Sequence, residues 1–550
     1  MDKKNILKFI FNIFSSSVSN NNDELSPLIS YKGNYLRVDA INLTLSRSGL
    51  FVMLPENFNV DDHVNKYPPE SNGFITALKK FDKDKIYHLL GLLSSIPARN
   101  KDLIVEDGFI PLDSTLLNSY MTDYNSYLKY LRNTGIIEWK DEGEYSEGKS
   151  RRYRWTSQYV SSRFIRVEMP KFSQKNETQK VITLEQFPSL KPELKQYLID
   201  YPYLLHWYKE NKLRININSA ENFALAIRDY KTSHGVTSWD WNKDKDKYKN
   251  PHNQYVAILE NMHSLALNND YKVQIDNNVH RLHSVLTNMQ KEFRNFLTYD
   301  SKQLVSIDIK NSQPYLSCIL FKPEFWGGDS SSYLTLNHLP QNIIDSIRFT
   351  PPKESAVSIT TALSIFFRKL VGNEFDSYKS IVSSGKMYET IMRWLQDEKN
   401  EAISREDAKT TMFKLFFSPN RENKEDSNHW LMTYYKAKFP SVAALFKIIK
   451  KHYQGLNEVK QHGRLACLLQ SIESEIILHR CCKRIWEEKN HQVPVFTIHD
   501  SIATTVEHKD YVKSIMKDEL TKAIGISPEL SEELWEENSL VAKYNKIGTI

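Results

Sequence analysis

Cysteine is scarce in this chain, with four in 550 residues. They are Cys318, Cys467, Cys481 and Cys482. Their spacing matches no metal-binding pair, and the two adjacent cysteines cannot readily bond to each other. The sequence therefore argues against a disulfide scaffold or a zinc module, and it favours a reduced protein of the cytoplasm.

Long apolar runs are also missing. The most apolar stretch near the N-terminus, residues 6–14, is interrupted by Lys8 and Asn12 and is too short to cross a membrane. No clear cleavage site follows it, so a secretory signal is not expected. Charged residues make up 25% of the chain and the net charge is only +6. This composition is typical of a soluble globular protein without a membrane partner, and it leaves the oligomeric state open.

The length of the chain predicts several domains, because 550 residues exceed what one compact core usually holds. Residues 15–26 are rich in Ser and Asn and indicate a tether. Residues 87–96 and 114–121 predict two helices, and a third is expected between an N-cap at Thr122 and Gly135. Two strand-like segments follow. This order is typical of a winged helix that touches nucleic acid; the alternative is a small α/β unit with solvated charges.

Residues 186–275 have a mostly helical pattern with one highly charged segment, 239–253, which is expected to be a solvated connection. The chemistry is concentrated after residue 276. Two aspartates there each accompany an apolar strand-like run: Asp308 in LVSIDIKNSQPYL and Asp500 in VFTIHDSI. In the second segment, His499 and Asp500 are expected in a tight turn of a hairpin, because another strand-like run follows them. If the strands are neighbours, two carboxylates lie together and can hold two Mg²⁺ ions. Either aspartate alone is more often a turn or capping residue.

A third segment carries two cations and two aromatic residues at helical spacing. Arg405, Lys409, Phe413 and Phe417 are each four residues apart, so they are expected on one stripe of a helix. The basic end of such a stripe can hold a triphosphate and the aromatic end a sugar or base. The alternative is a helix whose basic surface edge runs into the core.

Together these segments resemble the family A DNA polymerases, the bacterial DNA polymerase I family, and their relatives, the phage-type single-subunit RNA polymerases. SIDIKNSQ around Asp308 is similar to motif A, the stripe from Arg405 to Phe417 to motif B, and His499-Asp500 to motif C. The resemblance covers residues 276–530, about half the chain. It implies an α+β, right-hand polymerase with palm, fingers and thumb. The element order described above predicts an N-terminal helical, winged-helix-like region before it.

Together with the patterns in the N-terminal half, the resemblance predicts domain boundaries, and it also implies residue roles. The domains would be an N-terminal segment with a linker at 1–80, a winged-helix-like domain at 81–165, a helical thumb-like region at 166–275, palm at 276–320, fingers at 321–435 and palm again at 436–550. Asp308 and Asp500 would bind the metals, and Lys409 would join them as a catalytic residue. Nucleotide would be bound by Arg405, Lys409, Phe413, Phe417, Gln313 and Asn311, and nucleic acid by Arg281, Asn288, Gln290, Gln470 and His499.

Several residues depart from the family pattern. Ser501 follows Asp500 where the DNA enzymes usually have Glu, as it does in phage-type RNA polymerases. Gln313 stands where the sugar-selecting Glu is usual, and Asn311 replaces a Gln. Phe417 lacks the usual tyrosine hydroxyl. Gln313 is large enough to crowd a ribose 2′-hydroxyl, but its amide can also hydrogen-bond one, so the sugar preference stays open with deoxynucleotides favoured.

The predicted activity is template-directed DNA synthesis from dNTPs on a DNA primer-template, with two Mg²⁺ ions. Mn²⁺ is an alternative metal, and RNA is an alternative template or primer. No Asp-x-Glu exonuclease signature precedes residue 276, so proofreading is not expected. Two other functions compete with this one: a phage-type RNA polymerase or primase-like enzyme that uses NTPs, and a catalytically silent protein that binds nucleic acid.

Overall fold

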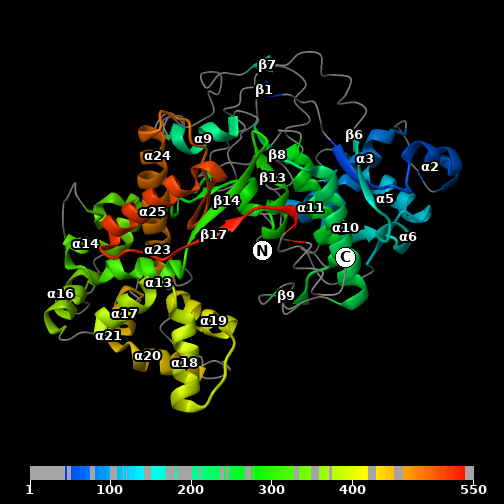
Figure 1. Cartoon of the computed structure of the whole chain (residues 1–550). Helices are drawn as coiled ribbons and strands as arrows, with labels where there is room; N and C mark the ends of the chain where they lie inside the picture. The colour runs from blue at the N-terminus through cyan, green and yellow to red at the C-terminus, as the bar shows by residue number, and fades with distance from the viewer. Residues whose placement is uncertain are drawn as a thin grey trace.

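The structure is a computed structural model that describes most of four ranges, 51–168, 201–348, 358–450 and 463–540, together with the short strands at 44–45 and 180–181. The gaps inside the four ranges are 73, 75–80, 100–107, 115–116, 119–120, 141–149, 210–211, 236–240, 243–246, 267–273, 277, 328–332, 371–373, 419–428 and 539. The tether predicted at 15–26 lies outside the described residues. The fold is α+β, with antiparallel sheets surrounded by helices (Figure 1).

A six-stranded antiparallel sheet lies at the centre of the molecule. Strand β14 (Lys302–Ile309) pairs with β13 (Leu297–Tyr299), β16 (Ser501–Thr505) and β17 (Leu530–Leu534). Strand β15 (Phe496–Ile498) extends the sheet beyond β16, and β8 (Leu213–Ile215) extends it beyond β13. The side chains of Leu304 and Ile307 in β14 are fully buried. The buried side chains of this strand therefore fix the position of Asp308, which follows Ile307 in the chain.

Helices from the C-terminal part of the chain pack beside this sheet (Figure 1). Helix α23 (Arg464–Ser474) continues through a π-helical segment, η9 (Glu475–Cys482), into α24 (Lys483–Glu488). Helix α25 (Lys509–Ile524) packs against η9 and against strands β14 and β16. Because eight residues of η9 have π geometry, the helix shifts its side-chain register immediately after α23.

A second group of helices extends away from the sheet, shown in yellow in Figure 1. Within it, α18 and α19 pack against each other, and α19 also contacts α23 of the sheet region. The segment from β14 to this group contains shorter helices. In chain order the elements are α13 (Ser312–Leu316), η7 (Ser317–Phe321), α14 (Pro323–Gly327), η8 (Leu336–His338), α15 (Gln341–Arg348), α16 (Ile359–Lys369), α17 (Glu374–Ser383), α18 (Met387–Lys399), α19 (Arg405–Phe417), α20 (His429–Lys438) and α21 (Pro440–Ile449).

The N-terminal part forms a unit of its own around a three-stranded sheet of order β3-β5-β4. The helix expected at 87–96 lies within α3, and Gly135 ends α5 with a φ of +75° as predicted. The expected N-cap at Thr122 was wrong, because Asp123 precedes the first helical residue. The elements are β2 (Phe51–Pro55), α2 (Val60–Lys66), η2 (Pro69–Asn72), α3 (Lys83–Arg99), β3 (Ile110–Leu112), α5 (Tyr124–Asn133), β4 (Ile137–Trp139), β5 (Arg151–Trp155), α6 (Ser157–Val160) and β6 (Phe164–Glu168).

Helix α11 connects this unit to the central part by packing against both α3 and α10. It begins at Pro251, so the end of the charged segment 239–253 is helical and not the solvated connection that was expected. Buried Lys231 of α10 donates a hydrogen bond to Gln254 of α11, 2.9 Å away. The elements here are β1 (Thr44–Leu45), β7 (Lys180–Val181), α9 (Pro202–Lys209), α10 (Ile217–His234), β9 (Trp241–Asn242), β10 (Lys247–Tyr248), α11 (Pro251–Ala266), β11 (Gln274–Ile275), β12 (Leu282–His283), α12 (Val285–Asn288) and η6 (Lys291–Phe296).

Within the described ranges, no helix combines the length and the apolar character needed to span a bilayer.

We expect Ile307→Ala to lower the free energy of unfolding by about 2–5 kcal/mol, because it opens a cavity under the central strand. Urea unfolding followed by circular dichroism measures this change. Val506→Ala is the matched control, because Val506 is 42% exposed and should change stability by less than about 0.5 kcal/mol. Equal effects of the two substitutions would show that β14 is not part of the core.

Candidate active site

The strand pairing places two aspartates next to each other. Asp308 in β14 lies opposite Ser501 in β16, and Asp500 directly precedes Ser501. His499 and Asp500 form the two-residue turn between β15 and β16, with His499 at a φ of +56°. The buried Ser501 hydroxyl donates to the Ile498 carbonyl across this turn, 3.0 Å away. The hairpin predicted from VFTIHDSI is confirmed, and Ser501 helps to close it.

The two carboxylates repel each other in partly buried surroundings. Burial is the largest cause that raises the pKa of Asp308 to about 7, and the negative charge of Asp500 adds to it. Burial also raises the pKa of Asp500, while the cations of Arg281 and Lys409 oppose that rise. Nearby positive charge therefore stabilises the ionised pair, and a bound cation would do the same more strongly.

A third carboxylate, Glu473 of α23, belongs to this cluster and was not predicted from the sequence. Its side chain is buried and accepts from Arg281 Nη2 at 2.5 Å and from Gln313 Nε2 at 2.7 Å. Burial raises the pKa of Glu473 to about 8, Arg281 opposes the rise, and the charges of Asp500 and Asp308 add to it. The sequence does contain one signal for Glu473: it is an acidic residue one turn after Gln470 in a largely apolar helix.

The segment after β14 presents polar atoms that lack partners. Asn311 has a φ of +54° and precedes α13, and its buried side-chain amide makes no hydrogen bond to any described residue. The same holds for the buried carbonyl oxygen of Gln313, whose amide nitrogen is held by Glu473. Buried polar atoms without partners are uncommon in native proteins. Their position beside Asp308 is suited to a polar ligand.

Helix α19 carries the predicted stripe, which confirms its helical spacing. Ser404 caps the helix through a reciprocal pair of hydrogen bonds with Asp407. The rings of Phe413 and Phe417 stack with centroids 5.4 Å apart and planes at 25°, and Lys409 Nζ lies 5.8 Å from the Phe413 ring centroid. Phe413 is 36% exposed. Lys409 lies near enough to Asp500 for its positive charge to oppose the rise in the pKa of that carboxyl.

Arg405 is engaged by a neighbouring helix. Its Nε lies 2.7 Å from a carboxylate oxygen of Glu389 on α18, and its guanidinium lies 5.1 Å from the Tyr388 ring centroid. Both partners of the ion pair are about half exposed, with side-chain exposures of 56% and 49%. Exposed ion pairs contribute little free energy, so this one can open for an anionic ligand.

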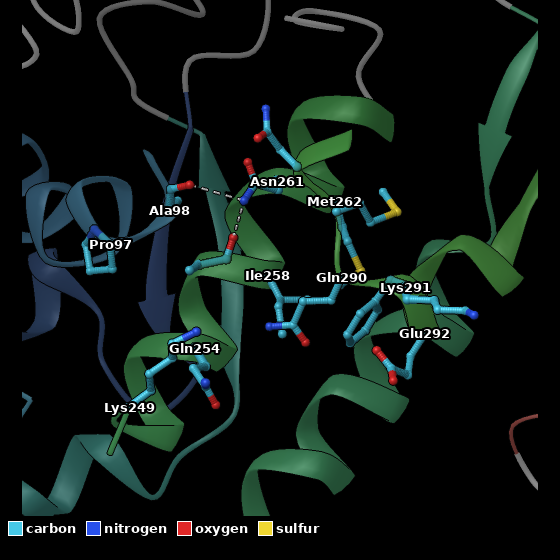
Figure 2. Close-up of a pocket in the computed structure, with 14 residues that line it drawn as sticks. Pro97, Ala98, Lys249, Gln254, Ile258, Asn261, Met262, Gln290, Lys291 and Glu292 are labelled. Carbon is cyan, nitrogen blue, oxygen red and sulfur yellow. Dashed lines mark hydrogen bonds between the residues drawn. The ribbon is translucent and has the colours of Figure 1, made fainter. Parts of the chain in front are cut away.

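The remaining predicted nucleic-acid residues lie in different places. Asn288 and Gln290 line a cavity of about 240 Å³ between the α12–η6 segment and helices α3 and α11, and Figure 2 shows Gln290 there with Lys249 and Asn261. The His499 ring is 6.5 Å from that of His283. Gln470 is half-buried on α23, one turn before Glu473. The structure therefore brings Arg281, Asn311, Gln313 and Lys409 to the aspartates, and it places Asn288 and Gln290 against α11.

The donor set fits a hard divalent cation. Across the ranges that the structure describes, no cluster of three or more His, Cys, Asp or Glu side chains is arranged to hold a metal ion. Asp308 and Asp500, which the strand pairing places next to each other, are the candidate metal ligands. Magnesium is commonly held by one or two carboxylates together with substrate phosphates and water, unlike metals that need a complete protein cage. The residues present fit that mode of binding.

Comparisons with known proteins find matches among solved structures. No family model matches the chain, and no curated protein matches it in sequence. A similar solved structure is the POL domain of Pol1 from M. smegmatis in complex with DNA primer-template and dNTP. It is 12% identical, the match covers 62% of this chain and 73% of that one, and the TM-score is 0.29. So distant a likeness establishes nothing about this chain, whose candidate site rests on its own contacts.

We expect Asp308→Asn to stabilise the metal-free protein more at pH 8 than at pH 5. The folded pKa of Asp308, about 7, exceeds its ordinary value of 3.8, so between these values the folded state binds more protons than the unfolded state. Wild-type stability therefore falls as pH rises through this window, and the asparagine variant escapes that loss. Thermal unfolding in EDTA at both pH values measures the difference.

The matched control for this experiment is Asp397→Asn, at an exposed position on α18. It should leave the pH dependence of unfolding unchanged. The same stabilisation by Asp308→Asn at pH 5 and pH 8 would contradict the proposed ionisation.

Proposed function

We propose that the chain is a template-directed DNA polymerase that transfers a nucleotide from a dNTP to a primer 3′-hydroxyl and lacks a proofreading exonuclease. The observation that carries the proposal is the convergence of Asp308 and Asp500 beside Lys409 of the α19 stripe. Two carboxylates next to a basic and aromatic helix face suit a nucleoside triphosphate, since each part of that ligand meets a matching group. In this proposal residues 276–320 and 436–550 are the palm, residues 321–435 are the fingers and the 166–275 region is thumb-like.

The residues of the chain divide the work of binding and proton transfer. Arg405 and Lys409 bind the triphosphate, with Arg405 leaving Glu389 to do so. Phe413, which is partly exposed and stacked on Phe417, contacts the nucleotide sugar and base. Lys409 can also donate a proton to the leaving pyrophosphate, on which negative charge develops.

Asp308 and Asp500 would hold Mg²⁺, with Mn²⁺ as an alternative. When bound, the metal supplies charge stabilisation for the attacking hydroxyl and the leaving pyrophosphate. The aspartates contribute oxygen ligands whose mutual repulsion such a cation relieves.

Nucleic acid is the proposed partner of two groups of residues, one at the site and one in the N-terminal part of the chain. Arg281, held by Glu473, would contact the primer end together with Gln470 and His499. In the N-terminal unit, the sheet order β3-β5-β4 and the preceding helices suit a winged-helix-like domain. There the guanidinium carbons of Arg132 and Arg151 lie 3.9 and 5.1 Å from the ring centroid of Trp139. A partly exposed aromatic ring flanked by cations is suited to nucleic acid.

Primer extension on a defined DNA template tests this function. The wild-type chain should incorporate dNTPs in the presence of Mg²⁺ or Mn²⁺, and Asp308→Ala and Asp500→Ala should each abolish incorporation, because each removes a metal ligand. Asp397→Asn is the matched control and should extend primers like the wild type. Preference for NTPs, or synthesis without a primer, would favour the RNA polymerase or primase-like alternative. No incorporation with either metal would favour the silent nucleic-acid-binding protein.

We expect Lys409→Ala to raise the KM for dNTP and to lower kcat, because Lys409 contacts a phosphate whose charge grows in the transition state. The loss in kcat/KM should be about 10²-fold or more. Single-turnover kinetics separate the two effects. Lys414→Ala, on the same helix but off the stripe, is the control, and kinetics for Lys409→Ala that match the wild type would remove Lys409 from the site.

A further inference from the structure

Glu473 links two groups of the candidate site that come from distant parts of the chain. One carboxylate oxygen accepts from Arg281 Nη2 at 2.5 Å, and the other accepts from Gln313 Nε2 at 2.7 Å. The Glu473 side chain is 2% exposed and that of Arg281 is 18% exposed. Both oxygens of Glu473 are therefore used, each by a different element.

Stability alone does not account for a charge in this position. Removing a carboxylate from water is costly, and apolar residues of similar size often give equal or greater stability than a buried ion pair. Glu473 also lies within reach of the charges of Asp308 and Asp500, which repel it. A residue that costs free energy in both ways is better explained by what it orients.

Gln313 is the side chain that Glu473 orients. A free glutamine side chain rotates about three bonds, but here its amide nitrogen is committed to a carboxylate that does not move with it. Gln313 is itself buried, on the first turn of α13, five residues after Asp308. The Gln313 amide is consequently held in one position near Asp308 and Asp500.

We propose that Glu473 is a positioning residue that sets sugar selectivity, because it holds the Gln313 side chain in place where the nucleotide sugar would bind. The proposal deepens the proposed polymerase function and rests on it. With Gln313 held, a ribose 2′-hydroxyl meets a side chain that cannot turn aside, and deoxynucleotides are favoured. Since the same carboxylate holds Arg281, the proposed primer contact and the sugar contact share one anchor.

Selectivity is measured as the ratio of kcat/KM for dATP to kcat/KM for ATP, with the full chain, Mg²⁺ and a DNA primer-template. Glu473→Met, which is similar in size but accepts no such hydrogen bond, should lower this ratio about tenfold or more, the loss expected for a hydrogen bond to a charged group. Glu473→Gln is the matched variant, because its amide can still hydrogen-bond Gln313, either as acceptor or, with the Gln313 amide turned over, as donor to the unpartnered Gln313 carbonyl oxygen. It should keep the ratio within about twofold of the wild type.

A double-mutant cycle distinguishes positioning of Gln313 from a general structural role. Gln313→Ala should lower the ratio by itself, and adding Glu473→Met to it should produce no further loss, since the two residues act through one contact. If Glu473→Met does not fold, as judged by circular dichroism, Glu473→Asp replaces it. The shorter side chain keeps the charge but falls short of Gln313, so the ratio should again fall.

Three results would overturn the proposal. In the first, Glu473→Met (or Glu473→Asp) keeps the wild-type ratio; in the second, its effect adds fully to that of Gln313→Ala. In the third, the wild-type enzyme uses dATP and ATP equally, which removes the selectivity but leaves the polymerase function standing. A wild-type chain that incorporates neither nucleotide overturns the polymerase function itself, and the role of Glu473 with it.

Discussion

The antiparallel pairing of β14 with β16 is the constraint on which the candidate site depends. It sets Asp308 opposite Ser501 and so brings Asp500, at the end of a two-residue turn, beside Asp308. Successive side chains of a strand point to opposite faces, so a slip of one residue would turn Asp308 away from Asp500 and bury it on the other side. The buried neighbours Ile307 and Ile502 fix the register, since only one register keeps both in the core.

This register concentrates negative charge, and the surrounding elements are arranged around it. Asp308, Asp500 and Glu473 all have raised pKa values, each with burial as the largest cause. Cations from two separate elements, Arg281 after β11 and Lys409 on α19, oppose the effect at Asp500. A cluster that balances its charges only in part is unfavourable for stability and favourable for binding a cation and a polyanion together. Under the proposed function, the stability lost to this unbalanced charge favours the binding of a metal ion and a triphosphate.

Much of this arrangement could be predicted from local sequence patterns. Four-residue spacing was enough for the α19 stripe, and an apolar run ending in a turn was enough for the hairpin at Asp500. Glu473 could not be predicted in the same way, because its partners Arg281 and Gln313 are 192 and 160 residues away in the chain. Asn288 and Gln290 fit a spacing pattern, but the structure places them in another cavity, which residues of α3 and α11 also line. Helix ends were predicted less well: the N-cap at Asp123 was missed by one residue, and α3 extends four residues before and three residues after the predicted 87–96.

Binding of Mn²⁺ in the presence of dATP tests the central claim, that Asp308 and Asp500 together form a metal site for nucleotide chemistry. Electron paramagnetic resonance counts free and bound Mn²⁺ without any turnover, so it reports on the site and not on activity. The account predicts that the wild-type chain binds Mn²⁺ with dATP and that the Asp308→Asn, Asp500→Asn double variant, with an unchanged circular dichroism spectrum, loses this binding. Equal Mn²⁺ binding by the two proteins would contradict it.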